Sequence, residues 1–184
     1  MKQYIGNCSD IIDWNSVVDS VKNSQPAYKG PRHTKEDDLP GIKEISEAWD
    51  KAGYTLASEG GTVGWDMCIP ETNFDKKIVQ QFSDYVGVDV LSCWVSVIHQ
   101  GYHAPWHWDW DVDWKEYEKK GNPVRFTAMI NEPAPGHVFI VGDKALYNEK
   151  QGDVHKWPDF KSYHGGTNCG LVPKFNFNYL AYSE

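Results

Sequence analysis

The sequence predicts an α+β domain in which a double-stranded β-helix, or jelly roll, carries N-terminal helices packed on one of its sheets. Residues 1–87 contain three segments with helical spacing of apolar residues, whereas residues 88–184 contain short segments rich in β-branched and aromatic residues. Glycine and proline clusters separate these short segments, and several short strands at such spacing are typical of a sandwich or jelly roll. We therefore expect a single domain over 1–184, with a mainly helical support region followed by a jelly-roll core.

Three helices are expected in the first half of the chain. Apolar residues recur with helical periodicity over residues 10–22, behind a Ser-Asp cap. A second helix is expected over about residues 40–51, with a proline in its first turn, and a third over 73–85, ended by a glycine. Residues 25–39 are rich in charged residues, proline and glycine and are expected to form a loop. Residues 60–69 alternate loosely between polar and apolar and are a candidate strand.

The second half is expected to supply the strands. Residues 88–99 are too rich in β-branched residues for another helix. Further strands are expected over residues 104–111, 124–130, 137–141 and 174–182.

Charge and length restrict the possible partners. The chain has 184 residues and a net charge of -8, from 18 basic and 26 acidic residues. A chain of this length can bury enough surface to need no disulfide or structural metal. We expect neither nucleic acid nor membrane as a partner, because both attract clustered lysine and arginine. Composition leaves the oligomeric state open.

The cysteines and the N-terminus suggest an intracellular setting. Cys8, Cys68, Cys93 and Cys169 are scattered and form no C-x-x-C pair, so free thiols in a reducing compartment are expected. The first residues lack the apolar core of a signal peptide, and no apolar stretch approaches the length of a membrane span. We therefore expect a cytoplasmic protein.

His107 and Asp109 are the first candidate metal ligands. Residues two apart in a strand share a face, so the expected strand over 104–111 points both side chains the same way. A mononuclear iron(II) oxygenase needs two histidines and one carboxylate on one face of an octahedron, with other positions open. His164, which lies 57 residues after His107 and before the last strand, is the candidate for the second histidine.

Other residues compete for this role. In a continuous strand, four further residues would lie on the same face as the His-x-Asp pair: His99, His103, Asp111 and Asp113. Asp109 is preferred because it lies one pleat from His107. His137 and His155 have no partner at ligand spacing and are expected to be strand or surface residues.

The order of these motifs resembles that of the iron(II)/2-oxoglutarate-dependent dioxygenases. The chain has HWD at 107–109, an H-x-x-x-N motif that starts at His164, and Lys174 ten residues after that histidine. The segment WPDFKSYHGGTN is similar to the aspartyl/asparaginyl β-hydroxylase-like and prolyl-hydroxylase-like branches. The resemblance covers about residues 88–182. The chain departs from the commoner pattern, which has arginine at the position of Lys174.

The resemblance implies a function. It implies that His107, Asp109 and His164 bind Fe(II), that 2-oxoglutarate is a cosubstrate, and that O2 is the oxidant. 2-Oxoglutarate would bind the iron through its 2-oxo and C1 carboxylate groups and be converted to succinate and carbon dioxide. A small molecule, amino acid or peptide side chain would be hydroxylated. The sequence contains no G-x-S-x-G element, P-loop or dinucleotide fingerprint that would suggest another mechanism.

Three further residues are candidates for binding the cosubstrate. Lys174 opens the last expected strand and lies on its polar face, where it can anchor the far carboxylate of 2-oxoglutarate. A lysine is a point charge without the fork of an arginine, so a neighbouring hydroxyl or Arg125 should share that carboxylate. Arg125 shares a strand face with Thr127 and Met129. This face either lines the barrel or lies on the surface of an edge strand, and the sequence leaves both open. Asn168, four residues after His164, is expected to hold the loop at His164 by hydrogen bonding.

Alternative interpretations remain at this point. Four of the nine tryptophans, Trp106, Trp108, Trp110 and Trp114, either line a pocket or fill the space between sheet and helices. The chain as a whole can also be a cupin-type metalloenzyme that does not use 2-oxoglutarate, a non-enzymatic carbohydrate-binding jelly roll, or an architectural jelly roll with an accidental histidine pattern.

Overall fold

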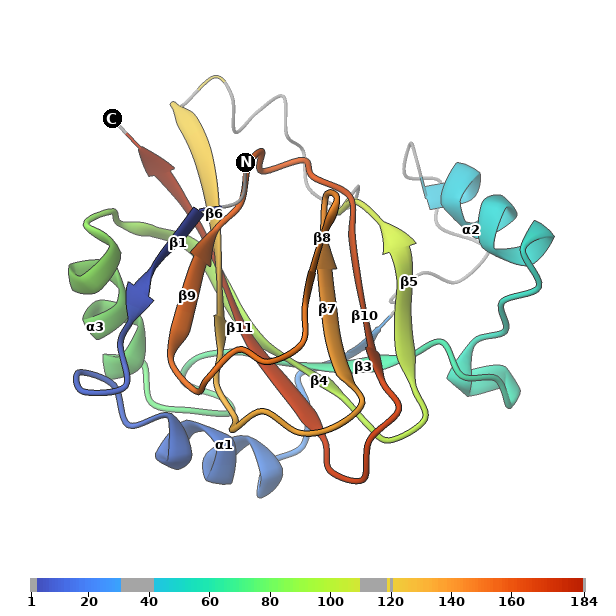
Figure 1. Cartoon of the computed structure of the whole chain (residues 1–184), viewed down its shortest axis with the longest axis horizontal. Helices are drawn as coiled ribbons and strands as arrows, with labels where there is room; N and C mark the ends of the chain where they lie inside the picture. The colour runs from blue at the N-terminus through green and yellow to red at the C-terminus, as the bar shows by residue number, and fades with distance from the viewer. Residues whose placement is uncertain (1–2, 31–41, 110–118, 120, 184) are drawn as a thin grey trace.

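The computed structural model describes residues 3–30, 42–109, 119 and 121–183. Two antiparallel sheets face each other (Figure 1). The larger sheet has, among the described residues, the order β1 (Gln3–Asn7), β9 (Asp153–Lys156), β6 (Asn122–Met129), β11 (Lys174–Ser183), β4 (Val90–Ile98), β3 (Trp65–Cys68) and β2 (Tyr28–Gly30). The smaller sheet has the order β5 (His103–His107), β10 (His164–Asn168), β7 (His137–Val141) and β8 (Lys144–Leu146).

The strands from β4 to β11 follow the connectivity of a jelly roll. The chain passes back and forth between the two sheets, so that strands adjacent in space are mostly far apart in sequence. The last strand, β11, pairs with both β4 and β6, and β10 pairs with both β5 and β7. The predicted fold class is confirmed.

Two of the three α-helices in the described part of the chain cover the outer face of the larger sheet. They are α1 (Trp14–Lys22) and α3 (Lys77–Val86). The aromatic face of β11 packs against them, with the Phe177 ring 5.4 Å from that of Trp14 and 5.0 Å from that of Phe82. Gly87 ends α3 in the left-handed conformation, with φ 72°, as its position in the sequence predicts.

The third helix, α2 (Ile42–Lys51), lies beside β5 and away from α1 and α3 (Figure 1). Its Trp49 is buried, and the indole Nε1 donates to the Trp106 carbonyl at 3.4 Å. The Trp49 ring also meets the His107 ring edge-on, with centroids 5.9 Å apart. Part of the support region is therefore built against the candidate metal site. The expected start of this helix, at about residue 40, lies outside the described residues.

Several boundaries differ from expectation. Helix α1 begins at Trp14, because Asp13 accepts the Ser16 backbone N–H and acts as the N-cap in place of the residues expected to cap it. Strand β5 ends at His107, whereas the expected strand continued to residue 111. The local sequence pattern does not predict β1, β2, β8, β9 or β10. These strands have five residues or fewer, and β10 contains two glycines, so they lack the local signal of a strand and depend on pairing with neighbours.

The four cysteines are free thiols, and Cys8, Cys68 and Cys93 are buried. Burial raises the pKa of Cys93 to about 12 and the pKa of Cys8 to about 11. These thiols therefore stay protonated near neutral pH and offer no nucleophile. Among the described helices, none is long and apolar enough to cross a membrane.

Candidate metal centre

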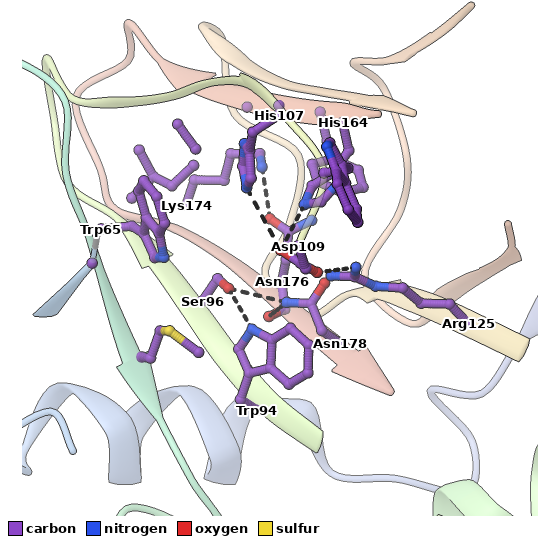
Figure 2. A pocket seen from close by; sticks show the side chains of 18 of the residues that line it. Trp65, Trp94, Ser96, His107, Asp109, Arg125, His164, Lys174, Asn176 and Asn178 are labelled. Carbon is purple, nitrogen blue, oxygen red and sulfur yellow. Dashed lines mark hydrogen bonds and ion pairs between the residues drawn. The ribbon is translucent and has the colours of Figure 1, made fainter. Parts of the chain in front are cut away.

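Three side chains converge at one point between the sheets. The ligand atoms of His107, Asp109 and His164 all lie within 4.8 Å of one another. Asp109 Oδ1 is 3.7 Å from His107 Nε2 and 3.5 Å from His164 Nε2. Figure 2 shows the three groups turned toward one another, with Arg125 reaching Asp109 from the other side. The structure thus brings together all three predicted ligands.

Strand pairing brings the two histidines together. His107 is the last residue of β5, His164 is the first residue of β10, and the two are direct partners in the antiparallel pair. Their ring centroids are 4.3 Å apart. Asp109 follows the end of β5, so its orientation comes from the chain beyond the strand and not from the pleat alternation that we expected.

Backbone hydrogen bonds orient both imidazole rings. His107 Nδ1 donates to the Pro105 carbonyl at 2.6 Å, and His164 Nδ1 donates to the Ser162 carbonyl at 3.2 Å. A carbonyl oxygen only accepts, so the proton of a neutral ring resides on Nδ1. The Nε2 lone pair of each ring is then directed toward Asp109, as is usual for histidines that bind metals.

The charge state of the site suits a divalent cation. Burial by itself raises the pKa of Asp109, but the positive charge of Arg125 and its hydrogen bond hold that pKa below its ordinary value. Burial, with a further contribution from His107, lowers the pKa of His164 well below its ordinary value. An ionised carboxylate beside a neutral imidazole is the protonation state that metal binding requires.

Two of the competing histidines have other contacts. His99 Nε2 lies 2.7 Å from Asp66 Oδ2, and the His103 ring packs 5.3 Å from that of Tyr54. Within the described residues, neither belongs to the ligand group. The two remaining competitors, Asp111 and Asp113, lie outside the described residues.

Two further histidines of the described residues have structural contacts. His137 in β7 is buried, and its Nε2 donates to the Val172 carbonyl at 2.9 Å. His155 in β9 is also buried, and its Nε2 lies 2.8 Å from Glu149 Oε2.

A cavity of about 230 Å³ adjoins the three ligands. Both sheets line it, and its walls include Ile98, Phe139, Gly166, Asn176 and Lys174. Lys174 is only 3% exposed, and its Nζ donates to Asn176 Oδ1 at 2.6 Å and lies 5.0 Å from the centre of the Phe139 ring. Burial lowers the pKa of Lys174 to about 7.

Arg125 also lines the cavity, but its guanidinium contacts Asp109. It is 3% exposed, and its Nη1 donates to Asp109 Oδ2. Residues 125–129 of β6 are all buried, and Arg125 is the described residue of this strand that lines the cavity, so its side chain points into the barrel and does not lie on an exposed edge.

Asn168 is placed elsewhere. It is fully buried, and its Nδ2 donates to the carbonyls of Ile98 at 2.8 Å and Val172 at 2.9 Å. Its Oδ1 accepts the Gly170 N–H at 2.9 Å. It is not among the described residues that line the cavity, and its amide ties the turn between β10 and β11 to the end of β4.

Some cavity residues were not singled out in the sequence. Ser96 Oγ accepts hydrogen bonds from Trp94 Nε1 at 3.1 Å and Asn178 Nδ2 at 3.0 Å. Trp65 stacks on the His107 ring with centroids 5.7 Å apart. Alternation along β11 could have identified Asn178, because it shares the strand face of Lys174. The residues of β3 and β4 line the cavity because these strands follow β11 in the order of the larger sheet, which the sequence does not reveal.

The tryptophan cluster divides between different environments. Trp108 lines the cavity, whereas Trp106 is 46% exposed and stacks on Tyr163 with centroids 6.1 Å apart. The other two members of the cluster, Trp110 and Trp114, lie outside the described residues.

Comparison with known proteins gives distant similarities. No family model and no curated protein matches the chain. A Trichoplax adhaerens prolyl hydroxylase, solved in complex with a hypoxia inducible factor peptide fragment, has 11% identity and a TM-score of 0.43, over 92% of this chain and 88% of that one. A Pseudomonas putida prolyl-4-hydroxylase has 12% identity and a TM-score of 0.42, over 94% of this chain and 100% of that one.

A third similar structure is an oxidoreductase of the 2OG-Fe(II) oxygenase family from Burkholderia pseudomallei. It has 12% identity and a TM-score of 0.40, over 58% of this chain and 51% of that one. Since every TM-score is below 0.5, the function proposed below depends on the geometry of the site.

Proposed function

We propose that this protein is an iron(II)- and 2-oxoglutarate-dependent oxygenase that hydroxylates a small molecule, an amino acid or a peptide side chain. The observation that carries the proposal is the convergence of two imidazole nitrogens and one carboxylate oxygen in a cavity that also contains a buried lysine. Two histidines and one carboxylate with open positions are the usual ligands of non-haem iron(II) oxygenases.

The residues fit such an ion. His107 and His164 each direct Nε2 toward Asp109 Oδ1, and backbone carbonyls hold the opposite ring nitrogens. When bound, iron(II) would supply the redox chemistry by which O2 oxidises the cosubstrate and the substrate. The task of the protein is to hold both molecules in place and to keep water away.

Lys174 is suited to bind the far carboxylate of 2-oxoglutarate. An ammonium group has three N–H donors, and Asn176 accepts one of them. A Cβ atom added at Gly166 would lie 3.4 Å from Lys174 Nζ, so the glycine keeps the space beside the ammonium group open. Gly166 is two residues along β10 from His164, which puts the lysine on the same side of the barrel interior as the ligands.

Ser96 is suited to be the neighbouring hydroxyl that shares the far carboxylate of 2-oxoglutarate with Lys174. Its oxygen accepts hydrogen bonds from Trp94 and Asn178, so its own hydrogen remains to be donated into the cavity. Ser96 is the direct cross-strand partner of Asn176, which contacts Lys174. We therefore include Ser96 with Lys174 in the cosubstrate site.

The test is succinate formation from 2-oxoglutarate under air, with iron(II) and ascorbate, screened against amino acids and peptides. We expect succinate from the wild-type protein and none from the His164→Ala variant. If the iron-loaded protein does not bind 2-oxoglutarate under anaerobic conditions, the proposal is wrong, and a metalloenzyme that does not use this cosubstrate becomes the better interpretation.

A further inference from the structure

The Arg125 guanidinium group contacts the rings of two tryptophans. Its Cζ lies 3.9 Å from the centre of the Trp157 ring and 5.2 Å from that of Trp94. Its Nε is buried and has no hydrogen-bond partner among the described residues. Contacts between a guanidinium group and an indole face are favourable when both are desolvated. The position of the guanidinium group therefore depends on the two indoles and on its bond to Asp109.

The two oxygens of Asp109 have separate partners. Oδ1 faces the two histidines, at 3.7 Å and 3.5 Å from their Nε2 atoms, whereas Oδ2 accepts from Arg125 Nη1. A carboxylate can bind a metal through one oxygen or through both. The hydrogen bond from the buried arginine competes with the metal for Oδ2, whereas Oδ1 faces the two histidines.

We infer that Arg125 is a positioning residue, which keeps Asp109 a one-oxygen metal ligand, and that it does not anchor the cosubstrate. The inference uses the metal site of the proposed function but does not depend on 2-oxoglutarate. It assigns Arg125 a different role from the cosubstrate contact that its strand position suggested.

Trp157 contacts both Arg125 and the metal ligand His164. The ring that supports the Arg125 guanidinium also packs against the His164 ring, with centroids 4.7 Å apart. Its Nε1 donates to Thr127 Oγ1 at 2.9 Å, which fixes the indole to β6. A single buried indole therefore supports both His164 and the partner of Asp109.

Whether Asp109 binds through one oxygen or two determines how many coordination positions of the metal ion stay open. Three protein atoms leave three positions of an octahedron open, whereas a carboxylate that binds through both oxygens leaves two. A cosubstrate that chelates through two atoms needs two positions, so only the one-oxygen arrangement keeps another position free.

The experiment counts the water molecules on bound manganese(II) by water-proton relaxation. Arg125→Met removes the charge and the donors while keeping a long side chain, and we expect it to hold one water fewer than the wild-type protein. The matched control is Lys156→Met on β9, which also removes a cation from the larger sheet but lies outside the cavity lining, and it should keep the wild-type water number. Circular dichroism checks folding, and Arg125→Leu, which also has no donor, replaces Arg125→Met if the latter does not fold.

The outcomes separate this inference from the proposed function. An unchanged water number in the Arg125 variant overturns the inference, and so does a selective loss of 2-oxoglutarate affinity in that variant with the water number unchanged. A wild-type protein that binds no manganese contradicts the metal site itself, which is a different result.

Discussion

Lys174 and Asn176 lie two residues apart on β11, and Lys174 Nζ donates a 2.6 Å hydrogen bond to Asn176 Oδ1 inside the cavity. Strand alternation puts both side chains on the inner face of the larger sheet. The amide is neutral, and among the described residues no carboxylate forms an ion pair with this lysine. A buried ammonium group without an anionic partner is a favourable place for a carboxylate ligand.

Replacement of Lys174 by alanine is expected to weaken the binding of 2-oxoglutarate. A charge-assisted hydrogen bond contributes about 1.5–3 kcal/mol, which corresponds to roughly a tenfold to hundredfold loss of affinity. The measurement is anaerobic titration of the iron(II)-loaded protein, followed through the metal-to-ligand absorption band. Manganese affinity should be nearly unchanged. An intact 2-oxoglutarate affinity in Lys174→Ala would place the anchor elsewhere.

The affinity for 2-oxoglutarate should fall as the pH rises above about 7. Burial lowers the pKa of Lys174 to about 7, so the ammonium form that pairs with a carboxylate predominates below this pH and is lost above it. The apparent affinity is expected to fall by up to about tenfold per pH unit. Lys174→Arg stays charged over this range and is the control. A wild-type profile as flat as that of the arginine variant would contradict this explanation.

Each of the three ligands should be required for metal binding. We expect His107→Ala, Asp109→Ala and His164→Ala to abolish the calorimetric signal of manganese(II), because each removes one donor from the group. His99→Ala is the control, since that side chain is paired with Asp66. Undiminished affinity in the His164 variant would be incompatible with the triad.

The helical layer should contribute stability without taking part in the chemistry. Phe82 is fully buried in α3 and packs against Phe177 and Tyr179 of β11. Phe82→Ala is expected to lower the free energy of unfolding by about 3–5 kcal/mol, measured by urea denaturation. Leu171→Ala, at a side chain that is 92% exposed, should change it by less than about 0.5 kcal/mol. Equal losses of unfolding free energy in the two variants would show that the packing of the helices on the larger sheet does not stabilise the fold.

The local patterns of the sequence were reliable where a strand or helix has a strong period of its own. Along β11 the aromatic residues face the helices and Lys174 faces the cavity, as their alternation indicated. The same alternation left Arg125 either inside the barrel or on an edge strand, and the structure places it inside. Gly87 ends its helix because a left-handed residue is needed there. These features depend on backbone geometry and on neighbours a few residues away, so one segment of sequence contains the information.

The local sequence patterns predict the fold class, the candidate ligands His107, Asp109 and His164, and the inward face of the last strand. The folded structure was needed to show that Asp109 turns in from beyond the end of β5, that Arg125 bonds Asp109, and that Asn168 holds a turn. It also decided that the short, glycine-containing strand β10 forms beside β5 and β7. The physical reason is that cross-strand register and ion pairing depend on residues distant in the chain, whose proximity is a property of the folded core and is not encoded in any local period.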